Sequence, residues 1–581
     1  MSKISGCLEG VSFLGPKSEN ASWLRSEFEG VLDQWFDWRR ALFSSDPSPV
    51  PMAMRASPEF RAEQDKLTQK VRELSEMMTG EVPKYTPRYI GHMVSELSVP
   101  ALLGHFVTLL HNPNNTSRDV ARVSGRVEDE AISMLASMIG FDPARAQGHF
   151  TSGGTIANFE SVWRARYRMD HFLALGLCIA ETTGERFDPV EFAHLGWDDY
   201  HALVAAHHIT DAELRNASAV LGNPFRVAAR ISSASGRAWE GPVLLVPGNK
   251  HFSWLKAANV FGLGEEAFWP VELDRHGRLS LAALAEVIDR AFDAGRPVLA
   301  VVSVAGTTEA GEIDPVDGVC DLLDTLRTKG RDIWHHVDAA WGGFLCSMLG
   351  GDASRALSEH AGRALTAIRR ANSVTLDPHK LGYVPYACGA FLVRDLANYA
   401  NSTFAAPYID RAAPNDRWMM TLEGSRSGSG AAAVWLTGKT LTFSADRFGE
   451  VMAGTLESRA YFEQALVSGS ERVRILKPID SNILCFSLAE KGEGLHASNA
   501  RTSRVYEAFA ADPEFAVSKT KLAVANYRRL IDSHLDQYGG QADCGSLVLI
   551  RCVFMNPFWR DPEVRAALMP RFLERLETHM N

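Results

Sequence analysis

The stretch DPHKLGYVPYACGAFLV places a lysine where its amine could react with a carbonyl group. Lys380 follows His379 and lies ahead of the apolar run GAFLV, which predicts a buried strand. Most lysines are exposed and have no chemical role, so Lys380 alone predicts nothing more than a surface residue. A lysine in a cleft can instead form a Schiff base with an aldehyde. The residues around it must decide between these interpretations.

Three other stretches place reactive or ligand-binding groups where predicted strands end. Asp338 ends the apolar run of DIWHHVDAAW, His251 follows the strand-like GPVLLVP, and glycines open a helical pattern in HFTSGGTIANFESVW. Open α/β sheets bind ligands at the carboxyl ends of strands, and a helix start offers free N–H groups to a phosphate. Each feature also has an ordinary explanation, as a capping aspartate, a satisfied core histidine or a turn that binds nothing.

In chain order, these residues supply a phosphate cradle, a ring that can stack on a flat ligand, a carboxylate for a pyridinium nitrogen and an amine for a Schiff base. Pyridoxal phosphate requires these four groups from its protein. The combination therefore predicts a pyridoxal-phosphate site.

The elements that would position these residues alternate between short apolar runs and amphipathic stretches over residues 96–400. This alternation predicts an α/β fold, with a mostly parallel sheet in a large cofactor-binding domain. Residues 1–95 have apolar positions at helical spacing and predict an N-terminal helical arm. Residues 401–581 predict a loop, a connecting helix and a small α+β C-terminal domain.

The overall composition favours small-molecule chemistry. The 581 residues include 60 Lys plus Arg and 70 Asp plus Glu, for a net charge of -10, so an electrostatic nucleic-acid surface is not expected. The eight cysteines form no C-x-x-C pair, which predicts reduced thiols and a cytoplasmic protein. No membrane partner is expected, because no run approaches the ~18 apolar residues of a membrane span.

Two other classes of site are weakly indicated. GLGEEA (262–267) and GSGAAA (428–433) fit the looser dinucleotide fingerprint, but neither follows a clear strand. His207-His208 and His335-His336 are adjacent pairs without the spacing of metal ligands, so no metal is expected.

Several stretches resemble the fold-type I, group II pyridoxal-phosphate amino-acid decarboxylases, and among these the bacterial tyrosine decarboxylases. The matching stretches are SFLGPKSENA, YTPRYIGHMVSEL, HNPNN, SVTLDPHKLGYVPY, TLEGSRSGSGAAAVW and CVFMNPF, which together span most of the chain. The resemblance implies a fold-type I domain that binds pyridoxal 5'-phosphate. It also implies a homodimer with shared active sites.

The resemblance assigns a role to individual residues. Lys380 would form the Schiff base, Asp338 would pair with the pyridine nitrogen, and His251 would stack on the ring. His92 would line the substrate pocket, and Ser425 would reach the phosphate bound by the partner subunit. The other cofactor-binding positions implied are Gly153, Gly154, Thr155, Thr308, Ala340 and His379.

Two tyrosines are candidates for returning a proton to the substrate carbon. Tyr408, in STFAAPYIDR, matches the segment where the family has a mobile-loop tyrosine, whereas Tyr386, in GYVPY, is typical of the tyrosine decarboxylase branch. Either could instead be a packing tyrosine whose hydroxyl finds a backbone partner.

By this resemblance the expected reaction is decarboxylation of an L-amino acid through a Schiff base and a quinonoid intermediate. The expected substrate is aromatic, with L-tyrosine converted to tyramine. Alternatives are decarboxylation of aspartate or glutamate, cleavage of a carbon–carbon bond as in sphingosine phosphate lyase-like enzymes, or a catalytically silent scaffold. The intact Lys380, Asp338 and His251 argue against the last of these.

Overall fold

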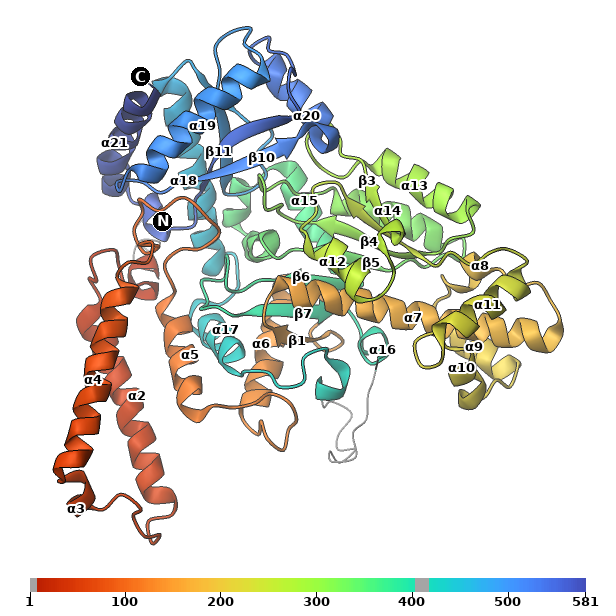
Figure 1. Ribbon diagram of the computed structural model, residues 1–581, viewed down its shortest axis with the longest axis horizontal. Helices are drawn as coiled ribbons and strands as arrows, with labels where there is room; N and C mark the ends of the chain where they lie inside the picture. Colours follow the sequence, from red (N-terminus) through yellow and green to blue (C-terminus); the bar gives the residue numbers. More distant parts are fainter. Residues whose placement is uncertain (1–7, 403–416, 581) are drawn as a thin grey trace.

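The computed structural model describes residues 8–402 and 417–580, so Tyr408 lies outside the described residues. Within this part, a large α/β body carries a smaller sheet-containing unit on one side and a projecting N-terminal helical hairpin (Figure 1). None of the described helices has the length and apolar character needed to cross a bilayer.

The large sheet has seven strands in the order β1-β7-β6-β5-β4-β2-β3. Its strands are β1 (Gln147–Thr151), β2 (Val243–Pro247), β3 (Phe268–Val271), β4 (Val298–Val304), β5 (His335–Asp338), β6 (Ser373–Leu376) and β7 (Gly389–Val393). Strand β7 pairs antiparallel with both β1 and β6, whereas the other neighbouring pairs are parallel. The predicted α/β fold with a mostly parallel sheet is confirmed.

Strands β2 and β4 are continuous apolar runs because helices cover both faces of the sheet. Leu244 and Val246 pack with α7, while Val243 and Leu245 pack with α13 and α14 on the opposite face. Every residue of both strands is buried. The sheet is therefore rigid where its strands end, which is where the chemistry-bearing residues were expected.

The helices of the large body belong to the sequence between residues 99 and 399. They are α5 (Val99–His111), α6 (Ser124–Met138), α7 (Gly154–Thr183), α8 (Pro189–Phe192), α9 (Trp197–Ala206), α10 (Asp211–Ala217), α11 (Pro224–Ser235), α12 (Ser253–Val260), α13 (Leu281–Asp293), α14 (Val316–Arg327), α15 (Glu359–Ala367) and α16 (Leu396–Tyr399). Helices α8 to α11 form a lobe at the far end of α7 (Figure 1).

Short 3-10 helices connect several of these elements. They are η1 (Glu265–Ala267), η2 (Gly342–Met348), η3 (Asp352–Ala356), η4 (Ile368–Arg370), η5 (Arg417–Met420) and η6 (Pro557–Arg560).

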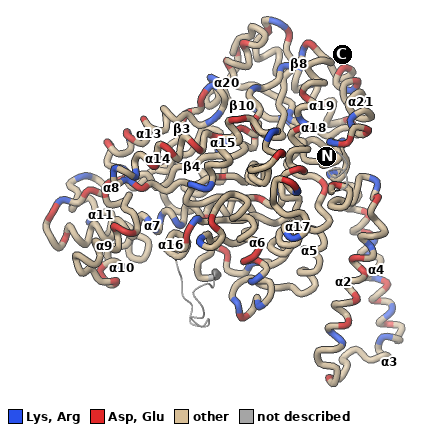
Figure 2. The backbone as a smooth tube through the Cα atoms, turned by 180° about the vertical axis from the view of Figure 1, so that it is seen from behind, with Lys and Arg blue, Asp and Glu red and all other residues tan. Residues whose placement is uncertain are grey.

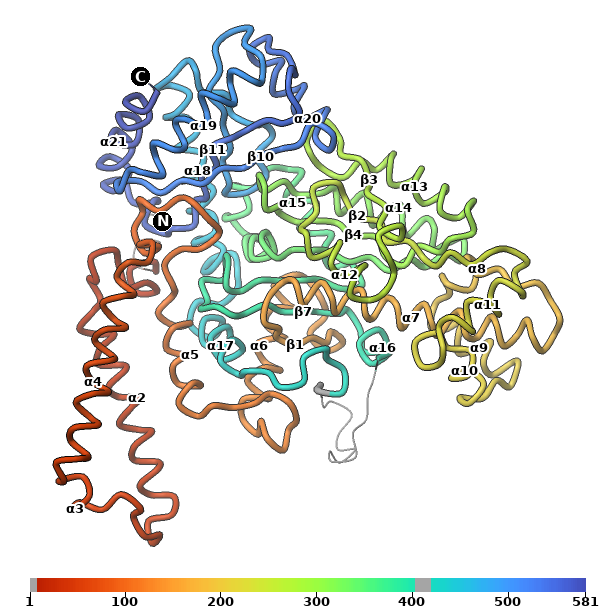
Figure 3. Tube along the Cα trace, viewed as in Figure 1, coloured from red at the N-terminus to blue at the C-terminus, as the bar shows by residue number. Residues whose placement is uncertain are grey.

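The smaller unit is built on an antiparallel sheet in the order β10-β11-β9-β8. Its elements, with the connecting helix α17, are α17 (Ser429–Leu441), α18 (Phe448–Gly469), β8 (Val473–Ile475), β9 (Ile483–Leu488), α19 (Leu495–Ala511), β10 (Ser518–Ala523), α20 (Val524–Asp536), β11 (Ser546–Val553) and α21 (Pro562–Met580). Phe462, Phe509 and Phe572, from three helices, pack together over this sheet. In the tube view, the orange α5 runs beside the cyan α17, far from it in sequence (Figure 3).

The N-terminal hairpin consists of α2 (Ala21–Leu42), α3 (Met52–Arg55) and α4 (Pro58–Met78). It projects from the body, and its two long helices carry interspersed charges of both signs (Figure 2). Helix α4 has no buried residue, although it includes apolar residues such as Leu67, Leu74 and Met77 that are 60–70% exposed.

Candidate active site

The carboxyl ends of β1, β2, β4, β5 and β6 meet at one edge of the large sheet, around a cavity of about 390 Å³. Most of the residues proposed from the sequence line this cavity, although they come from five different strand ends. They are Gly153, Gly154, Thr155, His251, Thr308, Asp338, Ala340, His379, Lys380 and Tyr386. The strands that carry them explain why distant parts of the chain converge here.

Lys380 lies in the turn that follows β6 and is paired with a buried carboxylate. Its Nζ is 2.9 Å from Oδ2 of Asp377, and its side chain is 20% exposed. Burial lowers the pKa of Lys380, but the Asp377 charge more than offsets this and leaves the pKa above its ordinary value. Burial likewise raises the pKa of Asp377, yet Lys380 and His379 bring it down to about 2. This pairing favours a protonated amine.

Asp338 ends β5 and is held by donors from three directions. Its Oδ2 accepts hydrogen bonds from Asn158 Nδ2 at 2.8 Å and from Trp254 Nε1 at 3.0 Å, and Oδ1 accepts one from the Ala340 N–H at 3.3 Å. The residue is only 4% exposed. These donors fix the orientation of the buried carboxylate.

His251 lies between β2 and α12, with its ring beside the charged residues of the cavity. The Ser253 N–H donates to Nδ1 at 3.3 Å, so the ring hydrogen of the neutral form is on Nε2. Burial lowers the pKa of His251, an effect that the Asp338 charge opposes and the Lys380 charge reinforces. The ring is therefore a neutral, flat surface near neutral pH.

The glycine turn between β1 and α7 is closely surrounded. A Cβ on Gly154 would lie 2.8 Å from Oδ2 of Asp377, and a Cβ on Gly389 would lie 2.6 Å from the Gly153 backbone. Only glycine leaves this space free, and α7 presents its first-turn N–H groups there. The turn has the form of an anion-binding cradle.

His379 lies next to this turn and is sandwiched between backbone and ring contacts. Its Nδ1 accepts a hydrogen bond from the Cys388 N–H at 3.1 Å, so the neutral ring carries its hydrogen on Nε2. The Tyr386 ring stacks on it with centroids 4.1 Å apart. Tyr386 is 57% exposed, so it lies at the rim of the cavity on the His379 side.

These residues fit pyridoxal phosphate. Lys380 supplies the amine, Asp338 a carboxylate for the pyridine nitrogen, His251 a ring face, and the glycine turn a helix N-terminus for the phosphate. The cavity also leaves a buried polar atom, Oδ1 of Asp377, without a hydrogen-bond partner in the described structure. Among the described residues, no group of three or more His, Cys, Asp or Glu side chains could hold a metal ion.

Three of the residues singled out from the sequence are not among those lining this cavity. His92 is exposed and lies near Arg551 of β11. Partial burial of the ring lowers the pKa of His92 most, and the Arg551 charge lowers it further. Ser425 is exposed and accepts a hydrogen bond from Asn114 Nδ2 at 3.1 Å. Tyr408 is outside the described residues. The roles expected for these residues stay predictions.

The sequence reasoning missed the residues that position the cavity's charges. Asp377 is part of the DPHK stretch, and its place three residues before Lys380 was a usable signal. Asn158 and Trp254 contact Asp338 from α7 and α12. No local pattern marks them, because their role depends on which helices pack against β5.

Comparisons with known proteins agree with this site. The family model "Pyridoxal-dependent decarboxylase conserved domain" matches residues 227–489. The chain is 29% identical to the L-tyrosine decarboxylase of Enterococcus faecium over 78% of this chain and 76% of that protein. It is 27% identical to the L-tyrosine decarboxylase of Levilactobacillus brevis over 98% and 95%, respectively.

A solved structure of Oryza sativa TDC with PLP and tryptamine has the same fold, with a TM-score of 0.62 and 17% identity over 97% of this chain and 99% of that one. The fold and the site thus define a fold-type I pyridoxal-phosphate enzyme. The family model over residues 227–489 and the two relatives support a pyridoxal-phosphate-dependent amino-acid decarboxylase. The predicted family, cofactor and enzyme class are confirmed.

Proposed function

We propose that this protein decarboxylates an L-aromatic amino acid, with L-tyrosine converted to tyramine and carbon dioxide. The main support is the similarity to two L-tyrosine decarboxylases over three quarters or more of each chain. The cavity also supports decarboxylation with pyridoxal phosphate, because it is lined by a lysine, a buried aspartate, a neutral histidine and a glycine turn suited to a phosphate. Pyridoxal phosphate, when bound, supplies the ring that accepts the electron pair left on Cα as carbon dioxide departs.

The residues of the chain then have separate tasks. Asp338, fixed by Asn158 and Trp254, would hold a proton on the pyridine nitrogen. His251 would cover one ring face and keep water from it. The turn at Gly153, Gly154 and Thr155, with His379 beside it, would bind the phosphate, and Thr308 and Ala340 would complete the walls.

Lys380 must lose a proton before its Nζ can act as a nucleophile. Asp377 lies 2.9 Å from Nζ and would hold and orient this amine in the cavity. We assign the return of a proton to Cα to Tyr408, with Tyr386 as the alternative donor. His92 remains our proposal for a substrate-pocket residue.

We also propose a homodimer with shared active sites. The apolar residues of α4 are exposed to solvent in a single subunit, and burying such a helix face against a second subunit usually stabilises an assembly. Ser425 is exposed and so is accessible to a second subunit. We keep the division of the chain into residues 1–95, 96–400 and 401–581 as part of this proposal. The seven described cysteines are all free, which is typical of a cytoplasmic protein.

The test is direct analysis of products. Protein loaded with pyridoxal phosphate is incubated with L-tyrosine, L-phenylalanine, L-tryptophan, L-aspartate and L-glutamate, and the amine and carbon dioxide are measured for each. Tyramine formed fastest, in equal amount to carbon dioxide, is the expected result. Faster release of β-alanine or γ-aminobutyrate would favour the acidic-substrate alternative. An aspartate 1-decarboxylase from Aliivibrio fischeri is 28% identical over 61% of this chain and 56% of that protein. Cleavage of an added β-hydroxy amino acid such as L-threonine to glycine and acetaldehyde, without carbon dioxide, would indicate a carbon–carbon lyase.

A further inference from the structure

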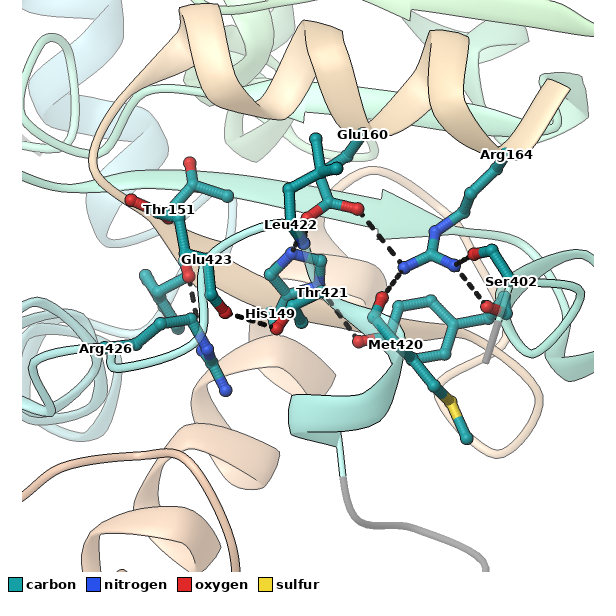
Figure 4. A network of polar contacts seen from close by, with 12 residues as sticks. His149, Thr151, Glu160, Arg164, Ser402, Met420, Thr421, Leu422, Glu423 and Arg426 are labelled. Carbon is teal, nitrogen blue, oxygen red and sulfur yellow. Dashed lines mark hydrogen bonds and ion pairs between the residues drawn. The ribbon is translucent and has the colours of Figure 1, made fainter. Parts of the chain in front are cut away.

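Helix α7 carries an arginine whose partners lie on both sides of residues 403–416. Arg164 is fully buried, and all four of its terminal N–H groups are used. It donates to the Tyr399 carbonyl, to Ser402 Oγ at 2.7 Å, to the Met420 carbonyl and to Glu160 Oε2 at 3.3 Å. Figure 4 shows the guanidinium between Ser402 and Met420. One side chain thus ties together the two ends of this segment.

Two further buried residues fix the position of Arg164. Glu160 Oε1 accepts from the Leu422 N–H at 2.7 Å and lies 3.0 Å from His149 Nε2. The other ring nitrogen of His149 is 2.9 Å from the Tyr399 hydroxyl. Burial would raise the pKa of Glu160, but His149 and Arg164 keep it below its ordinary value, so the carboxylate is charged.

We propose that Arg164, oriented by Glu160 and His149, is a positioning residue for decarboxylation, because it fixes residues 399–402 and 420–422, on either side of the segment 403–416, against α7. The inference rests on the proposed function, since that segment contains Tyr408, the residue to which we assign the proton transfer. Arginine suits this task because its planar fork can donate to several carbonyl oxygens at once in a fixed geometry.

The same contacts reach the cavity. Helix α7 begins at the glycine turn, and Glu423, next to Leu422, accepts a hydrogen bond from the Ser152 N–H at 3.1 Å. Ser152 lines the cavity. Residues 420–423, which follow the segment and which Arg164 and Glu160 hold, therefore lie directly beside the cofactor turn.

The chain offers a matched control one helical turn away. Arg168 is also on α7 and its side chain is 4% exposed. It donates to Asp332 Oδ2 at 2.7 Å, to the Asp332 carbonyl at 3.0 Å and to the Leu195 carbonyl at 3.0 Å. These partners belong to other parts of the chain, so replacing Arg168 disturbs α7 without releasing residues 399–402 or 420–422.

The experiment compares Arg164→Lys with Arg168→Lys, both loaded with pyridoxal phosphate. Lysine keeps the charge but cannot span four acceptors. Backbone hydrogen exchange is measured by mass spectrometry, together with cofactor absorbance, carbon dioxide and amine. For Arg164→Lys we expect exchange at residues 399–402 and 419–423 to rise about tenfold or more, as losing one to two hydrogen bonds predicts. We also expect less than one amine per carbon dioxide. Arg168→Lys should show neither change.

A smaller change separates the two ends. Ser402→Ala removes one acceptor and leaves Arg164 in place, so exchange should rise at residues 399–402 but not at 419–423. This variant also keeps the test available if Arg164→Lys fails to fold. Unchanged hydrogen exchange at residues 399–402 in Ser402→Ala would show that the Arg164–Ser402 contact does not fix these residues.

Two other results would overturn the proposal. Exchange in Arg164→Lys that matches Arg168→Lys at both ends would show that Arg164 does not fix them. Increased exchange with an unchanged amine yield and rate would show that fixing the ends does not serve the reaction. Failure of the proposed function is distinguishable, because then the unaltered protein releases no carbon dioxide from any substrate while the exchange difference persists.

Discussion

Two buried charged regions of this molecule use similar residues in opposite ways. In the cluster of His149, Glu160 and Arg164, both carboxylate oxygens and all four terminal arginine N–H groups have partners within the chain. In the cavity, Lys380 is partly exposed and Oδ1 of Asp377 has no partner. Arg164 Nε also lacks a hydrogen-bond partner among the described residues, but the protein encloses it, whereas Asp377 and Lys380 line an open cavity. Buried polar groups normally satisfy one another, so the unpaired oxygen beside the cavity marks the region arranged for a ligand.

The largest effect should come from the cavity amine. Lys380→Ala should abolish turnover, because among the described residues no other amine lines the cavity to bond the cofactor aldehyde. Lys380→Arg should fail as well, since a guanidinium is not deprotonated. Absorbance spectra and carbon dioxide release check this. If Lys380→Ala kept the cofactor absorbance and still formed product, Lys380 would not be the amine that bonds the cofactor, and the cavity would not differ from the Arg164 cluster in the way described.

Asp338→Asn should lower kcat by about 10²–10³ while the protein stays folded. The amide cannot hold a proton on the pyridine nitrogen, yet it can still pack against Asn158 and Trp254. Steady-state kinetics with circular dichroism as the folding control measure this. Turnover close to that of the unaltered protein would remove Asp338 from the chemistry.

The two tyrosines sharpen the comparison, because each Tyr→Phe change removes only a hydroxyl. Tyr408→Phe should leave carbon dioxide release but reduce the amine yield, whereas Tyr386→Phe should mainly raise KM. The ratio of amine to carbon dioxide is the decisive quantity. A ratio that falls only in Tyr386→Phe would reverse the assignment.

The pairing of Asp377 should appear as a pH-dependent stability of the cofactor-free protein. The pKa of Asp377 falls from 3.8 to about 2 on folding, so its contribution is present above pH 4 and is lost as the pH falls towards 2. The size at neutral pH is about 2 kcal/mol. Urea unfolding of Asp377→Asn should show this deficit at pH 6 and a shrinking one at lower pH. A deficit independent of pH would contradict the ionic explanation.

The smallest expected effect is that of the stacking ring. His251→Ala should weaken cofactor retention by about 0.5–1.5 kcal/mol, the usual value of a ring pair, and should slow the reaction. Equilibrium dialysis of the cofactor measures the first effect. His251→Phe is the control, because it keeps a flat ring without the imidazole nitrogens, and it should retain cofactor better than His251→Ala.

Sequence patterns identified the parts of the site that follow long apolar runs. Asp338 ends such a run and His251 follows one, and β2, β5 and β7 lie within the stretches predicted as strands. Strands β1 (QGHFT) and β6 (SVTL) were not predicted, because neither lies within a long apolar run. These two strands nevertheless carry the glycine turn and Lys380.

The buried cluster around Arg164 could not be predicted at all. His149, Glu160 and Arg164 resemble any helix or strand residues in the sequence, and their partners are separated from them by more than 200 positions. Their importance comes from tertiary packing, since a buried arginine is tolerated only where acceptors surround it. Hydrophobic periodicity is enough to predict the fold class, whereas this cluster depends on which distant residues the tertiary structure brings together.

The antiparallel strand β7 also governs when the site can be completed during synthesis. His149 of β1 lies opposite Phe391 of β7, and Gly389 packs against the glycine turn that follows β1. The turn is therefore translated long before its neighbour exists, and it reaches its final surroundings only after β7 has left the ribosome. Such distant pairing makes folding slow, because the intervening chain must first be brought together. For the nascent polypeptide, the cofactor cradle is among the last features of the large sheet to assemble.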